Sequence, residues 1–591
     1  MTYRAPLRRQ LLAYDISRNL VGQDFPAPDR DLVEAVISET ARFAETIFAP
    51  LDVTGDRSGA RFADGEVTLP TGFQEAYDAY VGAGWASLTA ADDFGGQAMP
   101  FAVSAIMQEQ FSSANLAFTL CMMLSQGAIA AIEAHASPHL KSLYLPPLVE
   151  GRWTGTMNLT EPQAGSDLSQ LRARAVPAGK NAYFITGTKI FITWGEHDLA
   201  ENIVHLVLAR LPDAPPGTKG ISLFLVPKFL PDDRGHPGKR NDVRCVSIEH
   251  KLGIHASPTC TMSFGDEGRC IGWLVGKPNA GLAAMFTMMN HARINVGLQG
   301  VGIAEIACQR ATAFARERIQ SPVHGALSRD AVPIVEHADV RRMLMTMRAL
   351  TDAARAIAYF NAAAVDAAHL GGNEAQRAAA QGRADLVTPV TKAFSTDIGV
   401  EVASLAIQVF GGMGFIEETG VARHYRDVRI TPIYEGTNGI QALDLVGRKL
   451  KVAGGEHCQA LLNDMQRWLA VLSEGSFASE ASILQIALEE LRDTSTLLKK
   501  AGAWDAAAAA TPYLRQFALV LGGTLLLVQA SHRMGRVADG ASDLPVEHSG
   551  ISVARFFVGH LLPQAAGFAA SVRAAGGLLA GPADTLFPSE G

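Results

Sequence analysis

The sequence of 591 residues has few cysteines and no closely spaced cysteine pair. Its six cysteines are scattered, without a C-x-x-C motif. Such spacing argues against a structural zinc site or a disulfide framework, and it indicates a reducing compartment. We therefore expect no metal. The cysteines are Cys121, Cys245, Cys260, Cys270, Cys308 and Cys458.

Concentrated positive charge and long apolar runs are also absent. With 51 basic and 59 acidic residues the formal net charge is −8, and no dense stripe of lysine or arginine occurs. The most apolar window, 517–528, has 12 residues, fewer than the roughly 17–25 that a membrane-spanning helix needs. Residues 1–20 contain four arginines but no apolar core, so no secretory signal is expected. We expect no nucleic-acid partner and no membrane span.

Several common nucleotide-binding and hydrolase motifs are missing as well. The sequence contains no G-x-x-x-x-G-K-[ST], H-E-x-x-H or G-x-S-x-G motif. Its best glycine cluster, Gly411-Gly412-Met413-Gly414, follows a helical pattern and does not fit G-x-G-x-x-G. A P-loop, a Rossmann site, a zinc peptidase and an α/β-hydrolase are therefore not supported.

The apolar pattern changes along the chain. Residues 31–149 repeat apolar side chains at helical spacing. Short β-branched runs separated by Gly, Pro and Asp then indicate an antiparallel sheet or small barrel. Helical spacing resumes at Gly281, and Gly454-Gly455 predicts a linker before an alanine-rich helical tail. The expected strands are 182–193, 203–209, 221–227, 243–248 and 259–264. The expected domains are 1–155 (helical), 156–280 (β), 281–452 (helical bundle) and 453–591 (extra C-terminal helices).

One carboxylate stands out in the segment 426–438. Glu435 follows a strand-like run and lies between Tyr434 and Gly436. Apolar neighbours disfavour the charged carboxylate, which raises its pKa toward the range useful for proton abstraction. Gly436 lets the backbone approach a ligand closely. The residues alone leave open an ordinary loop glutamate beside a turn glycine.

Three separated segments resemble the acyl-CoA dehydrogenase family. Residues 157–167, MNLTEPQAGSD, are similar to its flavin segment T-E-P-x-A-G-S-D. Residues 408–415, QVFGGMGF, are similar to its Q-x-x-G-G-x-G segment, and residues 426–437 to its catalytic R-D…Y-E-G-T. The resemblance covers roughly residues 31–450. It implies an α+β, mainly α fold: an N-terminal helical domain, a central β-barrel or sandwich and a helical bundle, here followed by an extra helical domain.

The resemblance implies FAD as the cofactor. Phe191 and Thr193 match a segment whose aromatic residue packs against the flavin and whose hydroxyl lies near its reactive nitrogen, although many members have tryptophan at the position of Phe191. The residues alone leave open that Thr160 and Ser166 cap turns and that Phe191 is a strand core residue. The flavin-segment residues implied to contact FAD are Met157, Leu159, Thr160, Gly165 and Ser166.

A second group of residues is implied to bind the dinucleotide of FAD. Arg318 matches the arginine that reaches the pyrophosphate of FAD bound by a neighbouring subunit, a task that suits a guanidinium. The Phe-Gly that usually follows in the family is absent at Ser321-Pro322, and a solvated helix residue is the alternative for Arg318. The remaining residues implied in this group are Gln408, Gly411, Gly412 and Thr437.

The resemblance implies that Glu435 is the base. It would remove the α proton of an acyl-CoA thioester while a hydride moves from the β carbon to flavin N5, leaving the trans-2-enoyl-CoA. Some members carry the base on an earlier helix just before an arginine. Here Ala292 precedes Arg293, and alanine cannot accept a proton. Arg293 matches an arginine near the CoA portion, with a structural ion pair as the alternative. Ser166, Tyr434 and Gly436 are also implied at the substrate.

The long C-terminal extension restricts the resemblance to one subgroup of the family. The chain continues for about 140 residues after Leu450 and has a long 227–244 connection. This profile resembles the long bacterial subgroup typified by 3-methylthiopropanoyl-CoA dehydrogenases. It implies a short or medium acyl-CoA substrate, electron-transfer flavoprotein as the acceptor, a homo-oligomer with a dimer favoured over a tetramer, and a bacterial cytoplasmic location favoured over the mitochondrial matrix. The alternatives are an acyl-CoA oxidase using O₂, or a relative of nitroalkane oxidases, and a flavin-bearing DNA-associated relative.

Overall fold

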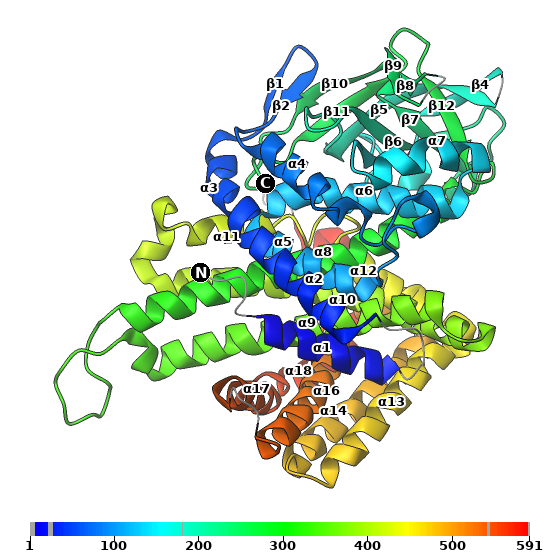
Figure 1. Ribbon diagram of the computed structural model, residues 1–591. Coiled ribbons are helices and arrows are strands. Elements are labelled where there is room, and N and C mark those ends of the chain that lie inside the picture. The colour runs from blue at the N-terminus through cyan, green and yellow to red at the C-terminus, as the bar shows by residue number, and fades with distance from the viewer. Residues whose placement is uncertain (1–5, 22–27, 180, 233–234, 541–543, 589–591) are drawn as a thin grey trace. The chain divides into compact units, whose positions relative to one another are not determined.

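The structure is a computed structural model that describes residues 6–21, 28–179, 181–232, 235–540 and 544–588 (Figure 1). The described chain divides into two compact units. The sheet unit spans residues 28–295. The helical unit combines residues 6–21 with residues 296–588. The α+β, mainly α architecture expected from the sequence is confirmed.

The sheet unit begins with helices whose ends are marked by polar capping residues. The Asp29 carboxylate accepts the N–H of Asp31 at 2.7 Å, and the Asn115 side chain accepts that of Phe118 at 3.1 Å. An aromatic cluster fills the core between the helices, with the Phe48 and Phe111 rings 4.9 Å apart. The helices are α2 (Arg30–Phe43), α3 (Ala49–Ser58), α4 (Phe73–Gly82), α5 (Phe101–Ala114), α6 (Leu116–His135) and α7 (Pro138–Val149), with a hairpin of β1 (Arg61–Ala63) and β2 (Glu66–Thr68).

The central sheet forms where the β-branched runs predicted strands. All five expected strands are present, and four of them have the predicted bounds. The pairings β5–β12–β7–β6–β4–β5 close a small barrel. Most pairings are antiparallel, and the small barrel is the one of the two expected arrangements that forms, while the pairing of β3 with β6 is parallel. The strands are β3 (Trp153–Asn158), β4 (Arg174–Gly179), β5 (Ala182–Thr193), β6 (Asn202–Arg210), β7 (Ile221–Pro227), β10 (Val243–Ile248), β11 (Thr259–Phe264) and β12 (Ile271–Val275), with β8 (Phe229–Pro231) and β9 (Pro237–Arg240) paired separately.

The helical unit contains long and short helices, with connections that include the long segment 318–337. Asn373 and Gln376 form a capping box at the start of α10. The strand-like run before Glu435 is not a strand. Residues 429–437 form turns, in which the N–H of Thr431 donates to Val428 and that of Ile433 to Ile430. The helices are α1 (Leu7–Val21), α8 (Gly281–Glu317, shared with the sheet unit), α9 (Ala338–Leu370), α10 (Glu374–Phe410), α11 (Val421–Val428), α12 (Asn438–Asp444), α13 (Glu456–Ser473), α14 (Ala478–Lys500), α15 (Ala503–Ala508), α16 (Ala510–Ala538), α17 (Leu544–Phe556), α18 (Gln564–Leu579) and α19 (Ala583–Leu586).

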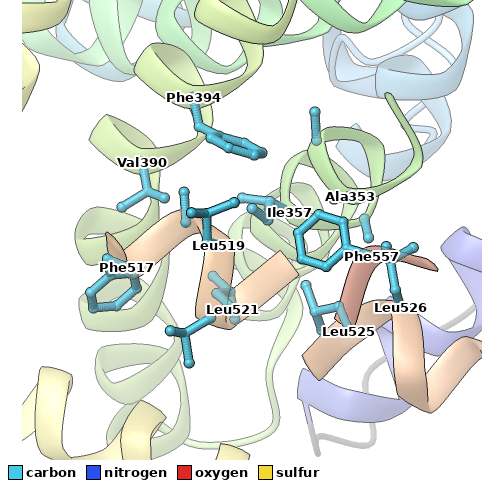
Figure 2. Packing of buried hydrophobic residues seen from close by; sticks show 14 of the residues in the cluster. Ala353, Ile357, Val390, Phe394, Phe517, Leu519, Leu521, Leu525, Leu526 and Phe557 are labelled. Carbon is cyan, nitrogen blue, oxygen red and sulfur yellow. The ribbon is translucent and has the colours of Figure 1, made fainter. Parts of the chain in front are cut away.

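The helices after Gly455 share one hydrophobic core with α9 and α10. Helix α16 packs against α9, α10 and α14, and its leucines belong to the same core cluster as Ala353 and Ile357 of α9 and Phe394 of α10 (Figure 2). Ala453, Gly454 and Gly455 have positive φ values of 50°, 66° and 89°, so a turn stands where the linker was predicted. The extra C-terminal helices are thus built into the core of the helical unit.

Among the residues that the structure describes, three helices are long and apolar enough to cross a membrane: α6, α16, and α10 with its extension to Phe415. The window 517–528 understated the apolar length of α16, which extends well beyond it, so the prediction that no segment is long enough was wrong. In α6 and α16, 78% and 89% of the most apolar window is buried within the protein, compared with 39% for the α10 segment. Apolar surface that packs on protein is not available to lipid, so α6 and α16 are core helices.

The core around α16 generates a stability prediction. Phe517 is fully buried, so Phe517→Ala leaves a large cavity and should lower the free energy of unfolding by about 3–5 kcal/mol. Urea unfolding followed by circular dichroism measures this change. Leu497→Ala, at a side chain 44% exposed in the same region, is the matched control and should shift the midpoint little. Equal shifts for the two variants would contradict the assigned core.

Candidate active site

In the sheet unit, the flavin segment and the end of β5 lie side by side. The N–H of Ile190 donates to the carbonyl of Thr160 at 2.9 Å, and Thr156 Oγ1 donates to the carbonyl of Thr193 at 2.7 Å. Phe191 lies at an irregularity in the β11–β5 pairing, has a φ of +56° and is 58% exposed. A strained, exposed aromatic residue on a bulge is typical of a binding surface. Phe191 is therefore not a strand core residue.

A buried ion pair, missed in the sequence, holds the flavin segment. Lys189 Nζ lies 2.8 Å from Glu161 Oε1 and donates to the Leu159 carbonyl at 3.0 Å, and both side chains are buried. Glu161 also accepts the N–H groups of Arg172 and Ala173, at 2.7 and 3.0 Å. Burial lowers the pKa of Lys189 to about 8, although Glu161 opposes that shift. Period-two alternation in β5 places Lys189 on the same face as buried Ile185, and this is the signal that could have revealed it.

Two neutral histidines contact β3, whose last residues begin the flavin segment. His197 Nε2 lies 2.9 Å from Thr154 Oγ1, and His205 Nδ1 lies 3.3 Å from Asn158 Nδ2. Both rings are buried, and burial lowers the pKa of each histidine to about 3. The two histidines therefore provide hydrogen-bond partners for the buried side chains of Thr154 and Asn158 without adding a buried charge.

The other expected residues of the sheet unit differ in exposure. Gly165 and Ser166 are exposed, and a Cβ on Gly165 would meet no atom within 4 Å. Met157 is buried in β3. Arg293 is also buried, and its guanidinium carbon lies 5.7 Å from the centroid of the Phe286 ring.

In the helical unit, a strained turn carries Glu435. We call residues 429–438 the base loop. Glu435 has a φ of +57°, a left-handed conformation that is unfavourable for a residue with a side chain. Buried Lys392 of α10 donates to the Gly436 carbonyl and to Asn438 Oδ1, each at 2.9 Å. Gln441 Nε2 donates to the carbonyls of Glu435 and Gly436, each at 3.3 Å. The two side chains therefore hold both carbonyls around the turn.

Hydrogen bonds also hold Tyr434 and Thr437, which lie on either side of Glu435 in the sequence. The Tyr434 hydroxyl donates a short hydrogen bond to Gln299 Oε1. Burial raises the pKa of Tyr434, and the charge of Glu435 raises it further, so the phenol stays protonated. Thr437 caps α12 by accepting the N–H of Ile440 at 3.2 Å, which leaves its O–H able to donate.

Four of the residues implied to bind the dinucleotide, all except Thr437, lie together at one end of the helical unit. The Phe314 and Phe410 rings stack 4.2 Å apart, which brings the C-terminal ends of α8 and α10 together. Arg318, Gln408, Gly411 and Gly412 are exposed there. A Cβ on Gly411 or Gly412 would meet no atom within 4 Å, so the backbone is open to a close ligand.

These residues fit FAD by the chemistry of their groups. Exposed Phe191 offers a face for the isoalloxazine ring, and the partly exposed Thr160 and Thr193 carry hydroxyls that can donate hydrogen bonds. Exposed Arg318 and the open backbone at Gly411 suit a pyrophosphate. Ala292, at the alternative base position, is buried and cannot accept a proton.

The buried histidines generate a pH prediction. Each has a folded-state pKa of about 3 against 6.5 unfolded, so between these values the unfolded chain binds the extra proton. The free energy of unfolding therefore falls as pH decreases from 6.5 to 3, by about 1.4 kcal/mol per pH unit for each ring. His205→Gln should show a shallower loss between pH 6 and 4 in urea titrations. Parallel profiles for wild type and variant would contradict the assignment.

Comparison with known proteins identifies the family of the chain. Domain models of the acyl-CoA dehydrogenase family match the chain at residues 33–152 (N-terminal domain), 156–266 (middle domain) and 279–450 (C-terminal domain). A model described as acetyl-CoA dehydrogenase C-terminal like matches residues 461–580.

Individual relatives extend the match over most of the chain. The 3-methylmercaptopropionyl-CoA dehydrogenase of Ruegeria pomeroyi is 50% identical over 81% of this chain and 82% of its own length. A butyryl-CoA dehydrogenase of Syntrophomonas wolfei is 34% identical over 90% of each chain. The structure of a Bacillus anthracis acyl-CoA dehydrogenase complexed with FAD, 20% identical, superposes with a TM-score of 0.74 over 94% of this chain and 90% of its own. The chain belongs to the acyl-CoA dehydrogenase family.

Proposed function

We propose that Glu435 is the base that removes the α proton of an acyl-CoA thioester in this FAD-dependent dehydrogenase. The observation that carries the proposal is the strained turn at Glu435, which Lys392 and Gln441 hold through the carbonyls of Glu435 and Gly436. A backbone held in an unfavourable conformation by buried donors is typical of a site that positions a reacting group. The alternative position, Ala292, offers no base.

The reaction then balances as a two-electron oxidation of the acyl group. The Glu435 carboxylate takes the α proton, and the electron pair of the broken C–H bond forms the Cα–Cβ double bond. FAD, held by residues such as Phe191, Arg318 and the open backbone at Gly411, would supply the two-electron acceptor for the hydride that leaves the β carbon. The family resemblance assigns the backbone N–H of Glu435 to the thioester carbonyl, where it would stabilise the developing enolate. Protonated Tyr434 beside Glu435 adds no competing base.

A short acyl-CoA is the proposed substrate, with 3-methylmercaptopropionyl-CoA and butyryl-CoA as the leading candidates. The support is the 50% identity to the Ruegeria enzyme and the 34% identity to the Syntrophomonas enzyme, each over most of the chain. The names of both relatives specify a short acyl group. Electron-transfer flavoprotein is the proposed acceptor of the electrons from the reduced flavin. The alternative is an acyl-CoA oxidase, in which O₂ accepts these electrons.

A homo-oligomer is proposed because the dinucleotide residues lie exposed with apolar neighbours. Met413 is 51% and Phe415 87% exposed beside Gly411 and Gly412, a surface suited to a second copy. The family resemblance places the FAD of a neighbouring subunit there. A dimer is preferred to a tetramer, with the C-terminal helices taking the place of a second interface. A cytoplasmic location is proposed because all six cysteines are free thiols.

Anaerobic bleaching of the flavin tests the proposed base. The purified wild type should be yellow and should bleach with a short acyl-CoA. Glu435→Gln should retain FAD but bleach about 10²–10⁴-fold more slowly, the range that a general base contributes. Glu418→Gln, at an exposed glutamate of the same unit, is the control and should bleach at the wild-type rate.

Bleaching of Glu435→Gln at the wild-type rate would remove Glu435 as the base. A panel containing 3-methylmercaptopropionyl-CoA, butyryl-CoA and longer acyl-CoAs ranks the substrates by kcat/KM. Rapid reoxidation of the bleached enzyme by air would identify an oxidase.

A further inference from the structure

The extra C-terminal helices hold α10 next to the base loop. Arg515 of α16 lies 2.9 Å from Glu401 Oε2 of α10, and its guanidinium carbon is 5.0 Å from the centroid of the Phe394 ring. Its side chain is only 16% exposed. Phe394, Asp397 and Glu401 are spaced by three and four residues and therefore share one face of α10. Figure 2 shows Phe394 beside Leu519 of α16 in the common core.

Asp397, between the two α10 residues that Arg515 touches, is joined directly to the base loop. Its Oδ1 accepts a hydrogen bond from Asn438 Nδ2 at 2.7 Å. Burial raises the pKa of Asp397, whereas the Asn438 hydrogen bond and the charges of Arg515 and Lys392 favour the ionised form. The charge of Glu401 raises the pKa of Asp397 as well, and Arg515 offsets that charge by pairing with Glu401.

Asn438 connects Asp397 of α10 to the turn at Glu435 through its other hydrogen bonds. Its Nδ2 also donates to the Ala393 carbonyl at 3.1 Å, while its Oδ1 accepts from Lys392. The Lys392 ammonium in turn holds the Gly436 carbonyl. Helix α12, which begins at Asn438, packs against α16 as well. Two routes therefore lead from α16 to the base loop, one through Asp397 and one through α12.

We propose that Arg515 is a positioning residue that acts through Asp397 and Asn438 to fix the base loop, so that the extra C-terminal helices set the rate of α-proton abstraction. This inference rests on the proposed role of Glu435. It gives the C-terminal extension a function in the reaction itself, beyond covering apolar surface.

A double-mutant cycle separates this role from a purely structural one. Arg515→Gln and Asp397→Asn should each slow the maximal rate of anaerobic bleaching by about 5- to 20-fold, a size typical of coupled contacting residues. FAD content and the acyl-CoA concentration giving half the maximal rate should stay unchanged. The double variant should be no slower than Asp397→Asn, because both changes break one pathway. Arg515→Lys, which keeps the charge, should recover most of the rate.

Arg555→Gln is the matched control. Arg555 also belongs to the C-terminal helices, pairs with Glu480 at 3.1 Å and lies 5.4 Å from the centroid of the Phe477 ring. The Arg555→Gln substitution should leave the bleaching rate unchanged. If Arg515→Gln fails to bind FAD, Arg515→Lys and Asp397→Asn carry the same comparison.

The outcomes separate this inference from the proposed function. Wild-type bleaching in Arg515→Gln, or a double variant whose loss is the product of the two single losses, would overturn the positioning role alone. A wild type that no acyl-CoA bleaches would overturn the proposed function and this inference together.

Discussion

The hydrogen bonds from the buried ammonium of Lys392 are the interaction on which the base loop depends. A left-handed residue with a side chain costs roughly 1–2 kcal/mol, and Glu435 has that conformation. A hydrogen bond from a charged donor contributes about 1.5–3 kcal/mol, and Lys392 makes two, to Gly436 and Asn438. The bonds are thus large enough to hold the strained turn. The surrounding α10, α12 and α16 keep the ammonium in place.

In the sheet unit, a buried lysine likewise donates a hydrogen bond to a backbone carbonyl of the flavin segment. Lys189 is buried in β5, pairs with Glu161 and donates to the carbonyl of Leu159. In each unit a lysine that is inaccessible to solvent holds a backbone carbonyl of a segment assigned to catalysis or FAD binding. A buried ammonium is costly to desolvate unless it is well paired. Losing one partner would therefore disturb the loop and the surrounding core together.

The sequence predicted the parts of the fold that depend on local patterns. Alternating β-branched residues predicted β5 and β11 with their observed bounds, and the position of Glu435 between an aromatic residue and a glycine indicated a candidate base. The strand-like run before Glu435 was misread because its backbone groups bond within turns. The parallel β3–β6 pairing and the contact of Lys392 with Gly436 join residues far apart in the chain, so no local pattern predicts them. The contact of Gln441 with the Glu435 carbonyl is local, but it depends on side-chain geometry that the sequence pattern does not contain. The Lys189–Glu161 pair left only a faint signal, a charge on the inward face of β5.

The most direct test of the role of Lys392 is the anaerobic bleaching rate of Lys392→Met, which removes the donor while keeping a side chain of similar length. If Lys392 holds the base in place, the variant should retain FAD and bleach about 100-fold more slowly with a short acyl-CoA, because small misplacements of a reacting group have effects of that size. A folded, FAD-containing Lys392→Met enzyme that bleaches at the wild-type rate would contradict that role.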